Sequence, residues 1–300
     1  MNNATEPADA AGGFQASPRL QELVNRAARE TLAKFAATRL EAGQLAITLA
    51  SWRDTAKPEW ASVRGGEPVY PASVIKLFYL VAAHRWMEDG RLADTAELRR
   101  ALRDMIVDSL NEATGLVVDS LTGTTSGPEL PPEELERWYE QRNAVNRYFT
   151  SLGYRNINVN RKPWCEGPYG REQQSVNLHP PHHRNWLTTD ATARLLVEIA
   201  TGRSVTRERS RQMMELLRRR PFAPEAEGQS REYTGAALPP GAQLWSKAGW
   251  TTEARHDAAY VELPGGAKFV LVTFTTGHAH EKEIIPAVAK VVVEGFASAG

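Results

Sequence analysis

Apolar residues near the start of the chain recur at the spacing of a helix. Ser17 and Pro18 are favourable first residues for one, and apolar positions follow from Leu20 to Leu32 at intervals of three and four. This pattern predicts a helix over 17–38. The short apolar run 45–52 then favours a strand, and a second helix is expected from Ser73 to about residue 90.

The middle of the chain has the pattern of helices. Helical spacing extends over 98–115 and 143–152, and Thr188 to Asp190 can cap a helix that ends near residue 200. Between these segments lies 156–186, rich in proline and glycine, which we expect to be a long irregular loop. A loop of that length in a compact protein is usually functional.

The pattern changes to short strands after Gly241. The runs 243–247, 258–263 and 268–275 alternate or are continuously apolar, and a helix over 281–297 ends the chain. Strands at both ends with helices between them indicate one sheet with an inserted helical lobe. We therefore predict an α+β fold, with a disordered N-terminus over 1–16 and one domain over 17–300. Its α/β lobe comprises 17–72 and 203–300, and its helical lobe 73–202.

Composition and charge exclude several classes of function. The chain has 300 residues, 36 basic and 36 acidic, so it carries no net charge that would attract nucleic acid. Mean hydropathy is −0.44 and no long apolar run is present, so we expect no membrane span. The single cysteine, Cys165, permits no intrachain disulfide. The first residues do not resemble a secretory signal, which favours a cytoplasmic protein unless a leader has been removed.

Ser73 and Lys76 are the first candidates for catalysis. They stand three apart at an expected helix start, so both side chains lie on one face of the first turn. A helix N-terminus favours developing negative charge, and a desolvated neutral lysine can take a proton from serine.

Two further segments can complete such a site. Ser109 could relay a proton to a leaving amine, and Asn111, two residues later, could orient Lys76 and bind the substrate. Lys247 at a strand edge supplies a cation, and Gly249 beyond it lets a substrate lie close to the backbone.

Together the order Ser-x-x-Lys, Ser-x-Asn and Lys-x-Gly resembles the motif set of class A β-lactamases and penicillin-binding proteins. The likeness extends over about 18–298 and includes the segments around Ser73, 105–118, 188–189 and 255–261. The resemblance implies a lobe with a mostly antiparallel sheet flanked by helices, beside an all-helical lobe. It also implies that Ser73 attacks an amide or lactam carbonyl, with no cofactor and no metal.

The resemblance assigns roles to further residues. The backbone N–H groups of Ser73 and Trp250 would form the oxyanion hole. Lys247 and Arg255 would hold a substrate carboxylate, beside Ala248 and Gly249. The partner is thus a small molecule or peptide with a carboxylate, and the oligomeric state is open.

Three positions depart from the family pattern. Leu110 replaces a mainly structural aspartate, and Ala248 replaces a hydroxyl residue that would contact the substrate carboxylate. Pro163 stands where class A enzymes carry the glutamate that activates the hydrolytic water. Glu166 is the possible substitute, with Glu172 as the other nearby carboxylate; either could be only a solvated loop acid.

These departures leave three functions open. The chain is a β-lactamase-like serine hydrolase with poor deacylation, or a D,D-peptidase, penicillin-binding protein or esterase, or a catalytically silent binding member of the fold. A metal site is not expected, because nothing indicates that the histidines at 179–183 and 278–280 converge.

Overall fold

A computed structural model describes residues 13–164, 167–178, 184–224 and 228–298. Its contacts divide the chain into a sheet unit, Met1–Val74 with Thr188–Gly300, and a helical unit, Ile75–Leu187. Among the described residues, no helix is both long and apolar enough to cross a bilayer.

In its described part, the sheet unit contains a seven-stranded sheet with the order β1-β3-β2-β7-β6-β5-β4. All neighbouring strands are antiparallel except β1 and β3, which confirms the predicted mostly antiparallel sheet. The strands are β1 (Gln15–Ala16), β2 (Leu45–Ser51), β3 (Glu59–Val63), β4 (Arg218–Arg219), β5 (Gln243–Trp250), β6 (Ala254–Glu262) and β7 (Lys268–Thr276). The expected disordered N-terminus lies mostly outside the described residues, but its last two residues form β1.

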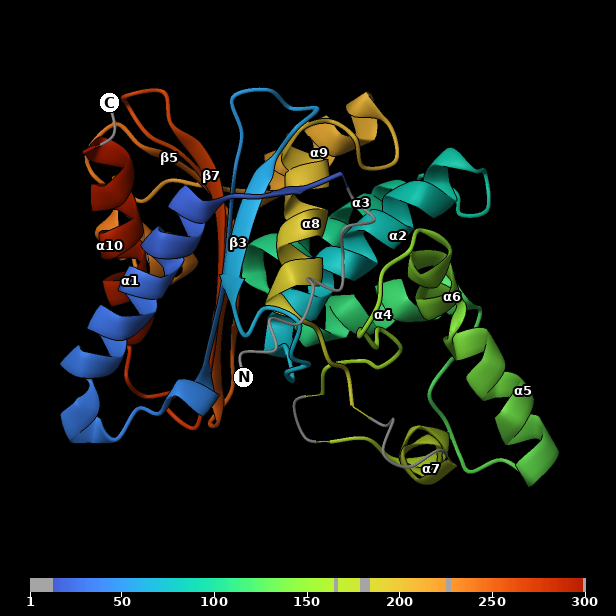
Figure 1. Cartoon of the computed structure of the whole chain (residues 1–300). Helices are drawn as coiled ribbons and strands as arrows, with labels where there is room; N and C mark the ends of the chain where they lie inside the picture. Colours follow the sequence, from blue (N-terminus) through green and yellow to red (C-terminus); the bar gives the residue numbers. More distant parts are fainter. Residues whose placement is uncertain (1–12, 165–166, 179–183, 225–227, 299–300) are drawn as a thin grey trace. The chain divides into compact units, whose positions relative to one another are not determined.

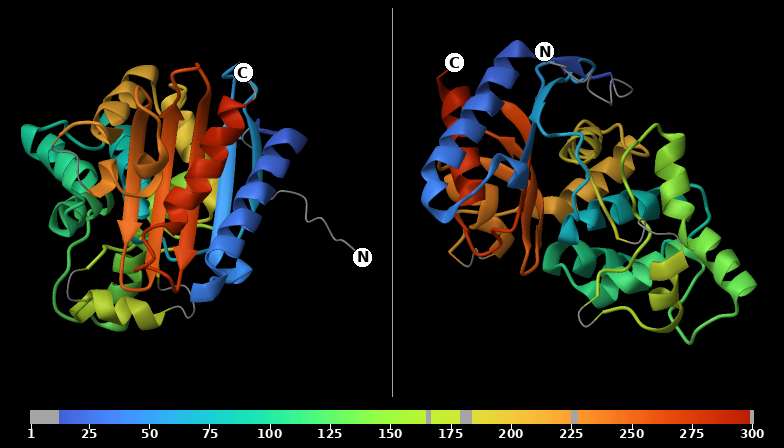
Figure 2. Two further views of the ribbon diagram at one scale, coloured as in Figure 1. Left: turned by 90° about the vertical axis from the view of Figure 1, so that its left-hand side faces the viewer. Right: turned by 60° about the horizontal axis from the view of Figure 1, so that its bottom comes forward.

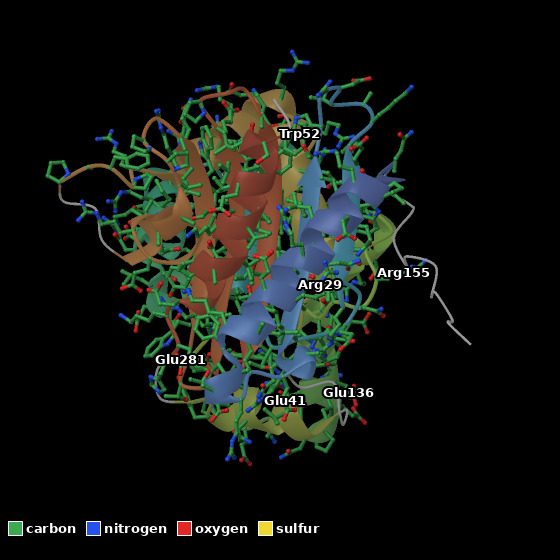
Figure 3. The ribbon with its side chains drawn as sticks, turned by 60° about the vertical axis from the view of Figure 1, so that its left-hand side comes forward. Arg29, Glu41, Trp52, Glu136, Arg155 and Glu281 are labelled. Atoms are coloured by element: carbon green, nitrogen blue, oxygen red, sulfur yellow. The ribbon has the colours of Figure 1, made fainter. Side chains whose placement is uncertain are left out.

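The two chain ends cover one face of this sheet. Helices α1 (Pro18–Lys34) and α10 (Ile284–Ala297) lie across it in Figures 1 and 2. Their apolar side chains, such as Leu20 and Val292, pack with alternate residues of the strands in one large core. Arg29, labelled in Figure 3, points from α1 into solvent. The apolar positions of the sequence pattern near both chain ends therefore face the core of the sheet unit.

Helix α8 (Thr189–Ala200) packs on β2, β6 and β7 and belongs to the sheet unit. The Thr188 hydroxyl accepts a hydrogen bond from Ala191 N at 3.0 Å, which confirms the predicted cap. Thr48 on β2 donates to the buried Asp190 carboxylate at 2.6 Å. The structure therefore assigns α8 to the sheet unit, whereas the prediction placed it in the helical lobe, because a polar tether and apolar packing hold this helix on the sheet.

Shorter elements complete the sheet unit. They are α9 (Arg207–Leu217) and the 3-10 turns η2 (Ala36–Thr38), η3 (Ala42–Gln44), η4 (Ala72–Ile75), η6 (Gly228–Ser230) and η7 (Tyr233–Ala237). The last residue of η4, Ile75, is already the first of the helical unit.

The helical unit is built around α2 (Lys76–Glu88), which is buried on nearly all sides. Its Phe78 meets Phe149 edge-on at 4.8 Å between ring centres, and Tyr154 joins the same cluster. The surrounding helices are α3 (Ala96–Arg103), α4 (Asn111–Thr122), α5 (Pro132–Arg142), α6 (Ala144–Ser151) and α7 (Gly170–Leu178), with the π turn η5 (Asp104–Asp108).

The structure breaks the predicted helix over 98–115 at its candidate catalytic residue. After the π turn, Ser109 adopts a left-handed conformation with φ of 60°, and a new helix begins at Asn111. The Leu110 N–H reaches back to Asp104 O at 3.0 Å. A π turn and a left-handed residue together mark a local departure from helix, which is frequent at functional positions.

The predicted loop 156–186 contains α7 and is anchored by buried charges. Glu172 on α7 accepts hydrogen bonds from Arg142 at 2.8 Å and Ser126 at 2.9 Å. Lys162 forms an ion pair with Asp119 at 2.6 Å, and Arg142 contacts the same carboxylate. Burial raises the pKa of Asp119, against the lowering effect of Lys162. The segment is therefore fixed to α4 and α5 by a network of ion pairs.

We predict that this network behaves as a unit. Arg142→Met or Glu172→Leu alone should lower the free energy of unfolding by about 3–5 kcal/mol, because each leaves a buried charge without its partner. The double variant should cost clearly less than the sum of the two, as measured by urea unfolding. Arg211→Met, which removes an exposed ion pair with Glu208, is the control and should change little. Fully additive losses would contradict the coupling.

Candidate active site

Ser73 lies in a strained turn at the edge of the sheet unit. It belongs to η4, which runs directly into α2, and Val74 N–H donates to Pro71 O at 3.1 Å. The preceding residue, Ala72, is buried and has φ of 47°, in the left-handed region. For alanine this conformation costs about 1–2 kcal/mol. Such strain persists only where surrounding contacts determine the backbone, as happens at functional sites.

Gly249 on β5 lies directly against this turn. A Cβ at position 249 would be 2.8 Å from Pro71 O, 2.9 Å from Ser73 N and 3.0 Å from Val74 N. These are backbone atoms, which cannot move aside as a flexible side chain would. The structure thus brings Ser73 and Gly249 together, and only glycine fits between them. Trp250 N, the second predicted oxyanion donor, follows Gly249 in the same strand.

Lys247 is completely buried on the same face of β5 as Gly249. Its Nζ donates to Ala248 O at 2.7 Å and to Gln229 Oε1 at 3.2 Å. Gln229 Oε1 also accepts from Ala248 N–H at 2.9 Å. Gln229 was not found from the sequence, because no motif or spacing connects the turn that carries it with β5.

Arg255 lies on the other face of the sheet. It pairs with Trp250 in the strand register, and its guanidinium stands 4.0 Å from the centre of the Tyr233 ring. It is buried and forms an ion pair with Glu232 at 2.5 Å. Strand alternation therefore separates Arg255 from Lys247 and Gly249. The structure places its guanidinium against Glu232 and Tyr233, and its predicted contact with a substrate carboxylate stays a prediction.

The helical unit brings together the remaining predicted residues. Lys76 is completely buried, and its Nζ donates to Ser109 O at 2.6 Å, to Ser109 Oγ at 3.3 Å and to Asn111 Oδ1 at 2.9 Å. The left-handed turn at Ser109 is what presents both its carbonyl and its hydroxyl to the amine. The convergence of Ser73 with Lys76 and Ser109 stays a prediction.

The deacylation residue is not identified by the structure. Glu166, the predicted candidate, lies outside the described residues. Glu172 is buried and engaged by Arg142 and Ser126, which favours a structural role. Within the described ranges, no group of three or more acidic, histidine or cysteine residues could hold a metal ion. The histidines at 179–183 are outside these ranges, and His278 contacts Gln44 at 3.0 Å.

Comparison with solved structures identifies the fold. The chain superposes on a β-lactamase from Sphaerobacter thermophilus with a TM-score of 0.67 and 20% identity, covering 92% of this chain and 98% of that one. PBP-A superposes with a TM-score of 0.64 and 18% sequence identity, covering 93% of this chain and 97% of that one. The TLA-1 extended-spectrum β-lactamase superposes with a TM-score of 0.68 and 14% sequence identity, covering 92% of this chain and 99% of that one. These likenesses establish a β-lactamase-like fold.

A family model gives the stronger result. The model described as the β-lactamase enzyme family matches residues 93–296, more than half of the 300-residue chain. The matched range contains Ser109, Asn111 and Lys247 and begins after Ser73 and Lys76. Comparison with curated proteins found no match. The extent of the family match, together with the fold, shows that this chain belongs to the β-lactamase enzyme family.

Proposed function

We propose that the protein is a serine hydrolase that forms an acyl-enzyme through Ser73 with a β-lactam or a related amide or ester. Family membership supports a serine hydrolase. The observation that carries the specific assignment is the contact of Gly249 with the Ser73 amide. Because of this contact, the Ser73 N–H lies beside β5, the strand that ends in Trp250. An oxyanion hole for the acyl carbonyl needs two such N–H donors close together.

The reaction proceeds in two stages. Ser73 Oγ bonds to the carbonyl carbon and gives up its proton, which we assign to Lys76 in its neutral amine form, with its lone pair as the acceptor. The N–H groups of Ser73 and Trp250 stabilise the oxyanion, and a lost donor of this kind costs about 3–4 kcal/mol in a serine protease. The bond to the leaving nitrogen then breaks, and a proton reaches that nitrogen through Ser109. Water later cleaves the ester and restores the Ser73 hydroxyl.

Substrate recognition is assigned to the β5 edge. Lys247 supplies the positive charge for a substrate carboxylate, while Gln229, which caps Ala248 N–H, provides a polar side chain where the family hydroxyl is missing. Arg255 is left out of this assignment, because it is engaged by Glu232 on the other face.

Deacylation is the slow stage in this proposal. Glu172 is held by Arg142, and Pro163 occupies the position at which class A enzymes carry their basic glutamate. Glu166 is the remaining candidate base. A variant of PBP-A, one of the structural neighbours, was solved as an acyl-enzyme complex with penicillin G, which makes a penicillin the natural probe.

We predict that wild-type protein incubated with penicillin G gains the mass of one penicillin and retains it over many minutes. Ser73→Ala should gain no mass, because the nucleophilic oxygen is absent. Intact-protein mass spectrometry measures both. Glu166→Gln should prolong the adduct only if Glu166 is the base.

The other outcomes discriminate the alternative functions. Rapid multiple-turnover hydrolysis without a persistent adduct would contradict slow deacylation and indicate a true β-lactamase. Unreacted penicillin with no adduct would contradict the substrate assignment and favour a different acyl group or a binding role.

We also predict that Gly249→Ala slows acylation by at least about tenfold, because its Cβ would displace the Ser73 turn from the strand. Gly265→Ala is the matched control, since a Cβ there meets nothing within 4 Å. The adduct formation rate with a fluorescent penicillin is the measurement. An unchanged rate in Gly249→Ala would contradict the assigned oxyanion hole.

A further inference from the structure

His256 is a buried residue of β6 that faces the candidate active site. In the strand register it is paired with Gly249, so the two lie on the same face of the sheet. Its ring packs on Phe274 at 4.5 Å between centres, and its side chain is completely buried.

The hydrogen bonds of His256 define its tautomer. Thr275 N–H donates to Nδ1 at 3.1 Å, so Nδ1 must be the unprotonated nitrogen. Nε2 therefore carries the hydrogen and donates it to Tyr70 O at 2.8 Å. Burial lowers the pKa of His256 to about 4, which keeps the ring neutral in this arrangement at neutral pH.

Tyr70 stands three residues before the nucleophile. Between them is Ala72, whose positive φ is strained, and beyond it the Ser73 amide rests against Gly249. The turn is thus held at two points, by the imidazole at Tyr70 O and by β5 at Ser73 N. The two residues that hold the turn, His256 and Gly249, belong to the adjacent strands β6 and β5.

We propose that His256 is a positioning residue for the nucleophile: its Nε2–H bond to Tyr70 O holds the strained turn so that Ser73 N–H stays beside β5. The residue touches neither substrate nor Ser73 and acts only through the turn. This inference rests on the proposed function for its effect on catalysis, whereas the tether itself is a property of the sheet unit.

Three variants separate the tether from simple packing. His256→Gln places an amide N–H near the position of Nε2 and should keep the acylation rate within about threefold of wild type. His256→Asn keeps an acceptor near Nδ1 but falls short of Tyr70 O, and His256→Phe preserves ring packing without either bond. Both should acylate about tenfold more slowly or worse, because a lost buried hydrogen bond releases the turn. The exposed His280→Gln is the control and should match wild type.

The measurements are the acylation rate with a fluorescent penicillin and hydrogen exchange of the peptide 70–76, each on variants with native circular dichroism. Exchange of this peptide should rise about tenfold in the Asn and Phe variants and stay near wild type in the Gln variant. Equal behaviour of all three variants in both measurements would overturn the tether. If wild-type protein is not acylated at all, the proposed function is wrong. Hydrogen exchange of the peptide 70–76 in the three variants then tests the tether by itself.

Discussion

The close approach of two backbones at Gly249 is the constraint on which the candidate site depends. Strand β5 can touch the turn at Ser73 only because position 249 has no side chain. The approach places the Ser73 amide beside the strand that ends in Trp250, and our proposal is that the N–H groups of these two residues bind one oxygen. Preorganised donors of this kind are commonly the largest single contribution to acyl-transfer catalysis. Strand pairing from β5 through β6 and β7 to β2 makes the platform rigid.

The two lysines of the candidate site each have hydrogen-bond partners within their own unit. Lys247 is buried against Gln229 and the Ala248 carbonyl, and Lys76 is buried among three oxygens of Ser109 and Asn111. A buried lysine side chain without such hydrogen-bond partners would be strongly unfavourable. Both amines are therefore held in defined positions before any substrate binds. Ala72 and Ser109 near these lysines have strained, left-handed backbone conformations. The packed strands and helices around them stabilise these conformations.

Motifs and periodicity predicted much of this structure. The terminal helices and the strands follow from residue types at fixed spacings, because these patterns reflect local geometry. The antiparallel arrangement of the strands was implied by the family resemblance. The place of α8 could not be predicted, since its attachment depends on Thr48, far away in the chain. The break at Ser109 was missed because helical apolar spacing continues through it.

In the candidate site, too, contacts between residues that are distant in the sequence could not be predicted from local patterns. Lys76 contacts Ser109 and Asn111, and the catalytic roles expected of these residues from their motifs stay predictions. Arg255 was expected beside Lys247, but the alternation of β6 turns it to the opposite face, where Glu232 meets it. Gln229 and His256 had no local signal, because each acts through a contact that only the folded sheet creates.

A crystal structure of the penicillin adduct would show whether Ser73 and β5 form the acylation site. We expect an ester on Ser73 Oγ whose carbonyl oxygen lies about 3 Å from both Ser73 N and Trp250 N. An adduct on another residue, or a Ser73 ester whose carbonyl points away from β5, would contradict this expectation.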